Sequence, residues 1–308
     1  MPFGGTVCAL RAAVGTGAAA EASGALRRGC TGAAVAPSQA CLLDTSAGGV
    51  GMWRGGVVGF VLRAAALVLY TAIRSVWALL PWRTREELLW ESQRWGRRIL
   101  RLCGVRLLVE GTAPVGSPVI YVCNHASLLD IPVLLAVLPP GLCFLYKEEL
   151  QRIPLFGWVL RRMPYVPIAR GQSLAAWRQL QQAAQQLQQY GLSPVVFPEG
   201  ERTPDGQLRA FRRGAFVLAA MVGHPVVPVA IAGTYRLLPR HRLRFLPGTV
   251  RVRIGEPLPP PPMERQEQQG YQERVRMLLQ RWLVELSEGL DSWAHARMPA
   301  SWSSESPN

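Results

Sequence analysis

The residues most suited to chemistry lie in the run NHASLLD at residues 124–130. Neutral imidazole is a suitable base near pH 7 for the proton of an alcohol, and a carboxylate beside it fixes its tautomer and stabilises the imidazolium. On a continuous helix, side chains five residues apart lie on different faces. His125 and Asp130 therefore meet only if His125 lies in a turn before the helix. Pro132 favours such a turn, because proline prefers the first helical turn.

Two plainer interpretations of this run stay open at this point. Asp130 is a residue type that often only caps a helix. His125 is then an ordinary turn residue without a chemical role. Spacing alone does not decide between these interpretations and a general base oriented by an acid.

A second run, FPEGERT at residues 197–203, follows a predicted strand. In open α/β sheets, ligands bind beyond the carboxyl ends of strands. Arg202 would grip a phosphate there, and Gly200 would let the backbone approach a ligand closely. The run FRRG at 211–214 adds two more cations. The alternative is a solvated, charged loop.

The elements that must position these runs alternate between short β-like and longer helical patterns. A helix is predicted over 173–190, with Leu174, Trp177, Leu180, Ala184 and Leu187 on one apolar face. Short runs rich in β-branched residues predict strands at 106–110, 119–122, 143–146, 165–168, 195–197, 226–232 and 250–254. This alternation predicts an α/β sandwich.

The apolar run 53–82 is the membrane candidate, with Trp53, Trp77 and Trp82 as interfacial anchors. Arg63 and Arg74 are eleven residues apart and share one helical face. We expect that face to pair with lipid phosphates while the opposite face meets the bilayer. The alternative is an ordinary amphipathic helix on the core.

The segments divide the chain as follows. The first is rich in Ala, Gly, Ser and Thr and lacks a hydrophobic period, which predicts a disordered or dispensable stretch, a transit peptide, or a start of translation at Met52. The expected divisions are 1–51 for this stretch, 52–95 for a membrane-associated helical segment, 96–256 for the catalytic domain, 257–263 for a Pro-rich linker, 264–290 for an amphipathic helix and 291–308 for a tail.

The net charge of the chain indicates which classes of partner it can bind. There are 34 Lys and Arg against 20 Asp and Glu, a net charge of +14, which indicates an anionic partner or an Arg-rich codon bias. Lys147 is the only lysine, and arginine suits bidentate phosphate contacts. A nucleic-acid module is disfavoured because no aromatic–basic interleaving of a recognised type is present. The six cysteines form no CxxC pair, which argues against a zinc site or disulfide framework and for a cytosol-facing location.

Four blocks in order resemble the lysophosphatidic acid acyltransferase family, the 1-acyl-sn-glycerol-3-phosphate O-acyltransferases among the glycerolipid acyltransferases. The resemblance covers roughly residues 60–255. Its blocks are the His-x4-Asp run 124–130; KEEL at 147–150 with IPLFG at 153–157 and VPIAR at 166–170; FPEG with Arg202; and VPVA at 227–230.

The resemblance implies a mixed sheet flanked by helices and a membrane-associated enzyme, on the cytosolic face of the inner or plasma membrane. It would acylate the free hydroxyl of 1-acylglycerol-3-phosphate to make phosphatidic acid. The implied donor is a thioester of coenzyme A or acyl carrier protein, with no metal, prosthetic group or serine nucleophile. The implied roles are base for His125, orienting acid for Asp130, phosphate contacts for Lys147, Arg170 and Arg202, and acceptor-site lining for Asn124, Glu199 and Gly200.

One position departs from the family pattern. Glu201 stands where a small hydroxyl residue is common, and a carboxylate beside a phosphate site repels it unless it turns away or pairs with Arg202 or Arg212. Another lysophospholipid or an amino-acid lyso-lipid is therefore an alternative acceptor. A catalytically silent membrane-binding protein is the other alternative, against which the intact His125 and Asp130 speak.

Overall fold

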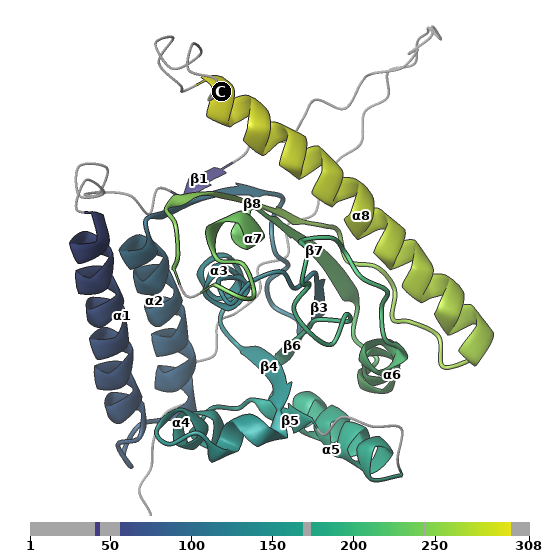
Figure 1. Ribbon diagram of the computed structural model, residues 1–308. Helices are drawn as coiled ribbons and strands as arrows, with labels where there is room; N and C mark the ends of the chain where they lie inside the picture. Colours follow the sequence, from purple (N-terminus) through teal and green to yellow (C-terminus); the bar gives the residue numbers. More distant parts are fainter. Residues whose placement is uncertain (1–40, 44–55, 169–173, 243, 297–308) are drawn as a thin grey trace, which may run out of the picture. The chain divides into compact units, whose positions relative to one another are not determined.

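The computed structural model describes residues 41–43, 56–168, 174–242 and 244–296 (Figure 1). Contacts divide the chain into Met1–Pro37, which lies outside the described residues, and one compact unit, Ser38–Asn308. All elements below belong to this second unit. The expected N-terminal stretch and the end of the expected tail fall mostly outside the described residues.

Strands of the described residues form one mixed sheet in the order β1-β2-β8-β7-β3-β6-β4-β5. Strands β3 to β7 run parallel to one another, and β8 is antiparallel to β7 but parallel to β2. The strands are β1 (Cys41–Leu43), β2 (Val105–Glu110), β3 (Ile120–Cys123), β4 (Leu142–Lys147), β5 (Val166–Ile168), β6 (Ser193–Val196), β7 (Val226–Ala232) and β8 (Gly248–Ile254).

The predicted α/β class and mixed sheet are confirmed, and seven strands lie where the β-branched runs placed them. Strand β1 corrects one expectation: residues 41–43, at the end of the stretch 1–51, are not disordered, because they pair antiparallel with β2; that the stretch is dispensable stays a prediction. Its sequence, Cys-Leu-Leu, is too short to carry a period of its own. Only the partner strand defines it.

Helices cover both faces of the sheet (Figure 1). Alternation along β3 separates two cores: Tyr121 and Cys123 face one, and Ile120 and Val122 face the other. The first core is covered by α1 (Gly56–Ala78), α2 (Arg85–Cys103), α3 (Asp130–Val137) and α7 (Thr234–Leu237), and the second by α5 (Leu174–Tyr190), α6 (Arg213–Val222) and α8 (Arg265–Ala296). A 3-10 turn at Glu148–Arg152 and α4 (Phe156–Arg162) connect β4 to β5.

The two long predicted helices are present with small differences. Helix α5 begins at Leu174, but Trp177, expected on its apolar face, is 42% exposed. Helix α8 runs to Ala296, into the expected tail. The Pro-rich segment before it is tied to the sheet, since Leu258 and Val226 exchange backbone hydrogen bonds.

The expected helical segment 52–95 is two helices, and the boundary expected at 95/96 falls inside α2. Thr84 caps α2: its hydroxyl accepts from the Glu87 N–H while the Glu87 carboxylate accepts from the Thr84 N–H. Gly104, in the left-handed conformation, ends the helix. The Thr-x-x-Glu spacing of residues 84–87 is the sequence signal for this capping box.

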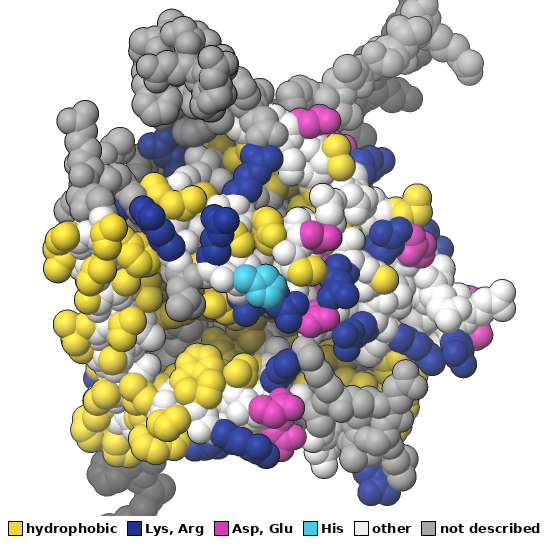
Figure 2. All heavy atoms as spheres, in the orientation of Figure 1, with side chains coloured by type: hydrophobic (Ala, Val, Ile, Leu, Met, Phe, Trp, Pro, Cys, Tyr) yellow, Lys and Arg dark blue, Asp and Glu magenta, His cyan; other side chains and the backbone are white. Residues whose placement is uncertain are grey.

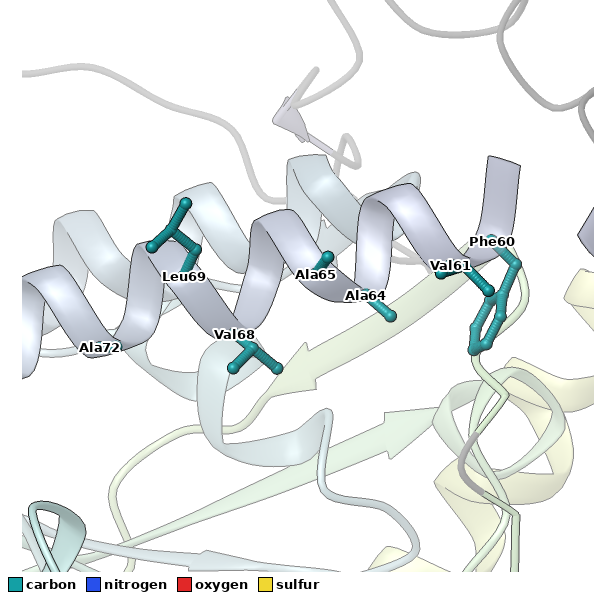
Figure 3. Close-up of a pocket in the computed structure, with 7 residues that line it drawn as sticks. All are labelled: Phe60, Val61, Ala64, Ala65, Val68, Leu69 and Ala72. Atoms are coloured by element: carbon teal, nitrogen blue, oxygen red, sulfur yellow. The ribbon is translucent and has the colours of Figure 1, made fainter. Parts of the chain in front are cut away.

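Helix α1 packs a mixed face, which includes Phe60, Leu67 and Tyr70, on the protein and turns an apolar face outward. Val57, Leu62 and Val68 are each at least 65% exposed, and an open apolar groove runs along Phe60, Val61, Ala64, Ala65, Val68, Leu69 and Ala72 (Figure 3). The span Val57–Ala78 is long and apolar enough to cross a membrane. An ordinary helix on a soluble core would bury this face.

Arg74 does not face outward as expected. Its Nε lies 2.6 Å from Glu91 Oε1 on α2, and one turn away the Trp95 indole donates to the Thr71 hydroxyl at 3.3 Å. The expectation that Arg74 pairs with lipid phosphates is therefore wrong. The carboxylate of a neighbouring helix, which sequence periodicity does not locate, neutralises this arginine instead.

Gly96 lets α2 approach α3 closely. A Cβ at this position would lie 2.8 Å from Leu135 Cβ and 3.0 Å from the Pro132 carbonyl oxygen. Gly96→Ala should therefore lower the free energy of unfolding by about 1–3 kcal/mol, because neither neighbour is a flexible chain end. Gly214→Ala in α6 is the control, since a Cβ there meets nothing within 4 Å. Denaturant unfolding in detergent measures both, and an unchanged Gly96→Ala would contradict the close packing.

Candidate active site

The turn after β3 begins with an amide clamp. Asn124 is buried, its Nδ2 donates to the Ile231 carbonyl at 2.9 Å, and its Oδ1 accepts from the Ile231 N–H at 2.8 Å. Asn124 was expected among the substrate-binding residues. Its side chain instead holds the end of β3 against β7, as a strand partner would.

His125 and Asp130 meet as the turn geometry predicts. Helix α3 begins at Asp130, and His125 Nδ1 lies 2.8 Å from Asp130 Oδ2. With the carboxylate accepting from Nδ1–H, the lone pair of the imidazole lies on Nε2. The His125 side chain is 15% exposed and that of Asp130 is fully buried. A mostly buried imidazole, with a small part of its surface accessible, thus contacts a fully buried carboxylate.

Asp130 is not a helix cap. The cap position of α3 is Leu129, without a side-chain bond to the helix. The Asp130 carboxylate points back into the turn, where Oδ2 also accepts from the N–H groups of Ala126 and Ser127 at 2.7 and 2.8 Å. These bonds fold the turn around the carboxylate.

The run 197–203 holds His125 from the other side. The Phe197 ring stacks on the imidazole with centroids 4.1 Å apart. The His125 N–H donates to Glu199 at 2.6 Å, and its carbonyl accepts from the Thr203 N–H at 2.9 Å. This run follows β6, which is adjacent to β3, so both come to the carboxyl edge of the sheet.

Glu199 is a clamp between two backbone segments. It is 3% exposed, and its second oxygen accepts from the Arg209 N–H at 3.0 Å. Burial raises the pKa of this carboxyl, and the bonds from the two backbone N–H groups lower it. Each Glu199 oxygen accepts from one backbone N–H, which shows a positioning role, and the expected role at the acceptor's glycerol stays a prediction.

Gly200 has φ of 75°, a left-handed conformation that favours glycine. A Cβ there would lie 2.8 Å from Arg212 Cδ. The close approach expected of a ligand is therefore made by an arginine side chain of the same molecule.

Glu201 is turned into a group of arginines. Its carboxylate lies 2.7 Å from Arg209, 3.4 Å from Arg240 and 4.0 Å from Arg212. The expected pairing with Arg212 is thus present, and the pairs with Arg209 and Arg240 add to it. The departure from the family pattern places a carboxylate among cations, which removes the repulsion it suggested.

Arg202 is left as the available cation. Within the described ranges its guanidinium forms no ion pair or side-chain hydrogen bond, although its carbonyl accepts from Arg240 at 3.0 Å. Burial and the Arg240 charge lower its pKa, while the Asp130 carboxylate raises it. The guanidinium therefore senses the charge of the carboxylate that holds His125.

Known proteins share this arrangement of sequence and fold. The Acyltransferase family model matches residues 106–232. A 1-acyl-sn-glycerol-3-phosphate acyltransferase of Cocos nucifera is 30% identical over 231 residues, 72% of this chain and 75% of that protein. The chain belongs to this acyltransferase family. The resemblance drawn from the four blocks is confirmed.

Other members of the family agree. A 1-acyl-sn-glycerol-3-phosphate acyltransferase of Pseudomonas aeruginosa is 33% identical over 201 residues, 63% of this chain and 76% of that protein. The crystal structure of the 1-acyl-sn-glycerophosphate (LPA) acyltransferase PlsC of Thermotoga maritima has a TM-score of 0.62 and 32% identity. It covers 74% of this chain and 92% of that one.

Lys147 and Arg170 are the other two expected phosphate contacts, and the structure describes only Lys147. Lys147 is the exposed last residue of β4, beside β6, so it lies on the same edge of the sheet as the His125 turn. Arg170 lies outside the described residues. Across the described part of the chain, no group of three or more His, Cys, Asp or Glu side chains is placed to hold a metal ion.

Sequence reasoning missed three contributors to this site. Phe197 belongs to the FPEG block, and its position directly after a strand was the sequence signal for a role beside His125. Arg209 and Arg240 carried none, since Arg240 is 38 residues from the carbonyl that it binds. Only the folded chain brings these arginines to Glu201.

The clamp role of Glu199 is testable. Glu199→Gln places an NH2 group against one of two backbone N–H donors, so we expect a loss of about 1–3 kcal/mol in stability and lower turnover. Glu256→Gln, at an exposed glutamate, is the control. Thermal unfolding and acyl transfer are measured together. A Glu199→Gln protein with full stability and activity would show that the clamp is dispensable.

Proposed function

We propose that this protein transfers a fatty acyl chain from an acyl thioester to the free hydroxyl of 1-acylglycerol-3-phosphate, forming phosphatidic acid. The observation that carries the proposal is the His125–Asp130 pair on a rigid turn, beside the available Arg202. The names of the relatives give the same reaction class. The position of Glu201 among arginines removes the main argument for a different acceptor.

His125 acts as the general base in this proposal. Nε2 takes the proton of the acceptor hydroxyl as its oxygen attacks the thioester carbonyl. The carbon–sulfur bond then breaks, and the thiolate leaves with the proton returned by the imidazolium. The ionised Asp130 stabilises that imidazolium and keeps Nδ1 protonated. Direct transfer needs no serine nucleophile.

Arg202 is the first candidate for the acceptor's phosphate, with Lys147 and Arg170 as further contacts. A guanidinium forms two parallel hydrogen bonds to a phosphate, which fixes the acceptor's orientation as well as its charge. The donor is a thioester of coenzyme A or acyl carrier protein.

The membrane attachment we propose rests on α1 and α4. Ile153, Phe156 and Trp158, in and before α4, are 46%, 46% and 54% exposed, and α4 packs against α1. Figure 2 shows hydrophobic side chains gathered over these helices beside a surface rich in Lys and Arg. Apolar and aromatic side chains suit the bilayer interface, and cations suit anionic head groups. We place the site at the cytosolic face.

Removing the base should abolish most activity. His125→Ala should lower kcat by a factor of about 10²–10⁴, because general-base catalysis contributes that much. His224→Ala is the matched control, since His224 precedes β7 at the opposite edge of the sheet. Phosphatidic acid formation from 1-acylglycerol-3-phosphate is measured on folded protein. Near-normal turnover by His125→Ala would refute the mechanism.

Removing the available guanidinium should affect phosphate-bearing acceptors selectively. Arg202→Ala should raise KM for 1-acylglycerol-3-phosphate by roughly 10- to 100-fold, the worth of a charge-assisted hydrogen bond. An uncharged monoacylglycerol should lose far less. Arg276→Ala, on the surface of α8, controls for the change in charge. Equal losses with both acceptors would contradict a phosphate contact.

A further inference from the structure

A second group of arginines, separate from those around Glu201, lies in the connection between α7 and β8. A cavity of about 260 Å³ is lined there by Arg236, Pro239, Arg242, Arg244 and Leu246. Three of these side chains are guanidinium groups and none is a carboxylate. The volume is small for a whole ligand but fits a compact anionic group.

Arg242 and Arg244 have no counter-charge in the described residues. Both are exposed, and the Arg244 guanidinium lies over the Phe60 ring, 5.9 Å from its centroid. Arg240, two residues earlier than Arg242, is instead held by Glu201 and by the Arg202 carbonyl. Neighbouring arginines repel one another unless an anion lies between them. The chain therefore neutralises one arginine of this loop and leaves two available.

The cavity is coupled to the His125 turn through the same loop. The Ser127 hydroxyl donates to the Leu238 carbonyl at 2.8 Å, and Pro239, the next residue, lines the cavity. At the other end of the loop, the Phe245 ring lies 5.3 Å from that of Phe60 on α1. The loop that carries the cavity thus contacts the His125 turn at one end and the first turns of the apolar helix at the other.

We propose that Arg242 and Arg244, with Arg236, bind a phosphate of the acyl donor. The inference rests on the proposed function. The acceptor carries its phosphate close to the reacting hydroxyl, which requires a cation beside His125, and Arg202 is there. The donor carries its phosphates at the far end of a pantetheine arm, which requires cations at a distance from the imidazole. Arginine suits this group because its planar donors match phosphate oxygens.

Lipid head groups carry phosphates as well. They are a second candidate source of the bound group, because the loop that carries the cavity contacts α1. The two sources predict different losses. A donor site changes KM for the thioester, and a head-group site changes binding to vesicles while leaving that KM unchanged.

The test compares Arg242→Ala/Arg244→Ala with Arg265→Ala/Arg281→Ala, which removes the same charge from the surface of α8. The full chain in uncharged detergent is assayed with acyl-CoA or acyl carrier protein thioester, whichever the wild type uses. We expect KM for the thioester to rise at least ~10-fold in the first variant alone, with KM for 1-acylglycerol-3-phosphate within about twofold. Titration with free coenzyme A or the carrier protein should show the same loss.

Each other outcome overturns the assignment. A selective rise in KM for 1-acylglycerol-3-phosphate would make the cavity part of the acceptor site. Unchanged kinetics with weaker binding to phosphatidylglycerol vesicles would make it a head-group site, and unchanged kinetics with unchanged vesicle binding would make it neither. A wild-type protein that forms no phosphatidic acid with either thioester would refute the proposed function itself, which the variants do not address.

Discussion

The site depends on one buried carboxylate. Glu199 joins the N–H of His125 to that of Arg209, so the turn after β3 and the loop after β6 are held to one another. A buried charge without a cation is costly unless hydrogen bonds replace its hydration. Because both donors are backbone groups, the bond fixes the chain and not just a side chain. Asp130 works in the same way from the other side, accepting from the N–H groups of Ala126 and Ser127. The imidazole then has little freedom left, and the Phe197 ring limits what remains.

The positive charge around His125 depends on which arginines are paired with carboxylates. A chain with net charge +14 has more cations than it can pair, so the position of each carboxylate decides which arginines stay available. Glu201 pairs with Arg209 and Arg240, and within the described residues the guanidinium of Arg202 forms no ion pair. A small hydroxyl at position 201 would leave more positive charge near the imidazole. The glutamate therefore lowers the positive potential around this turn while its carboxylate stays paired with arginines.

Local sequence patterns predicted much of the fold. The β-branched runs located seven strands, and Pro132 located the start of α3 and so the meeting of His125 with Asp130. What could not be read depends on partners far along the chain. The polar face of α1 was visible, but not that Glu91 of α2 would take Arg74. Glu199 and Asn124 were recognised as site residues, yet their bonds to backbone of other elements assign them to positioning. Periodicity reports which face is polar and not which molecule meets it.

The inverted amphipathicity of α1 connects the membrane to the chemistry. Arg74 and Thr71 of α1 bind α2, and the apolar side chains that α1 turns outward have no partner in the described protein and suit lipid. Helix α2 in turn presses Gly96 against α3 at Pro132 and Leu135, and α3 begins with the carboxylate that holds His125. Each contact in this series is close and leaves no room for a water layer. A bilayer that held the outward face of α1 would therefore also orient the His125 turn, because α2 and α3 connect the two through direct contacts.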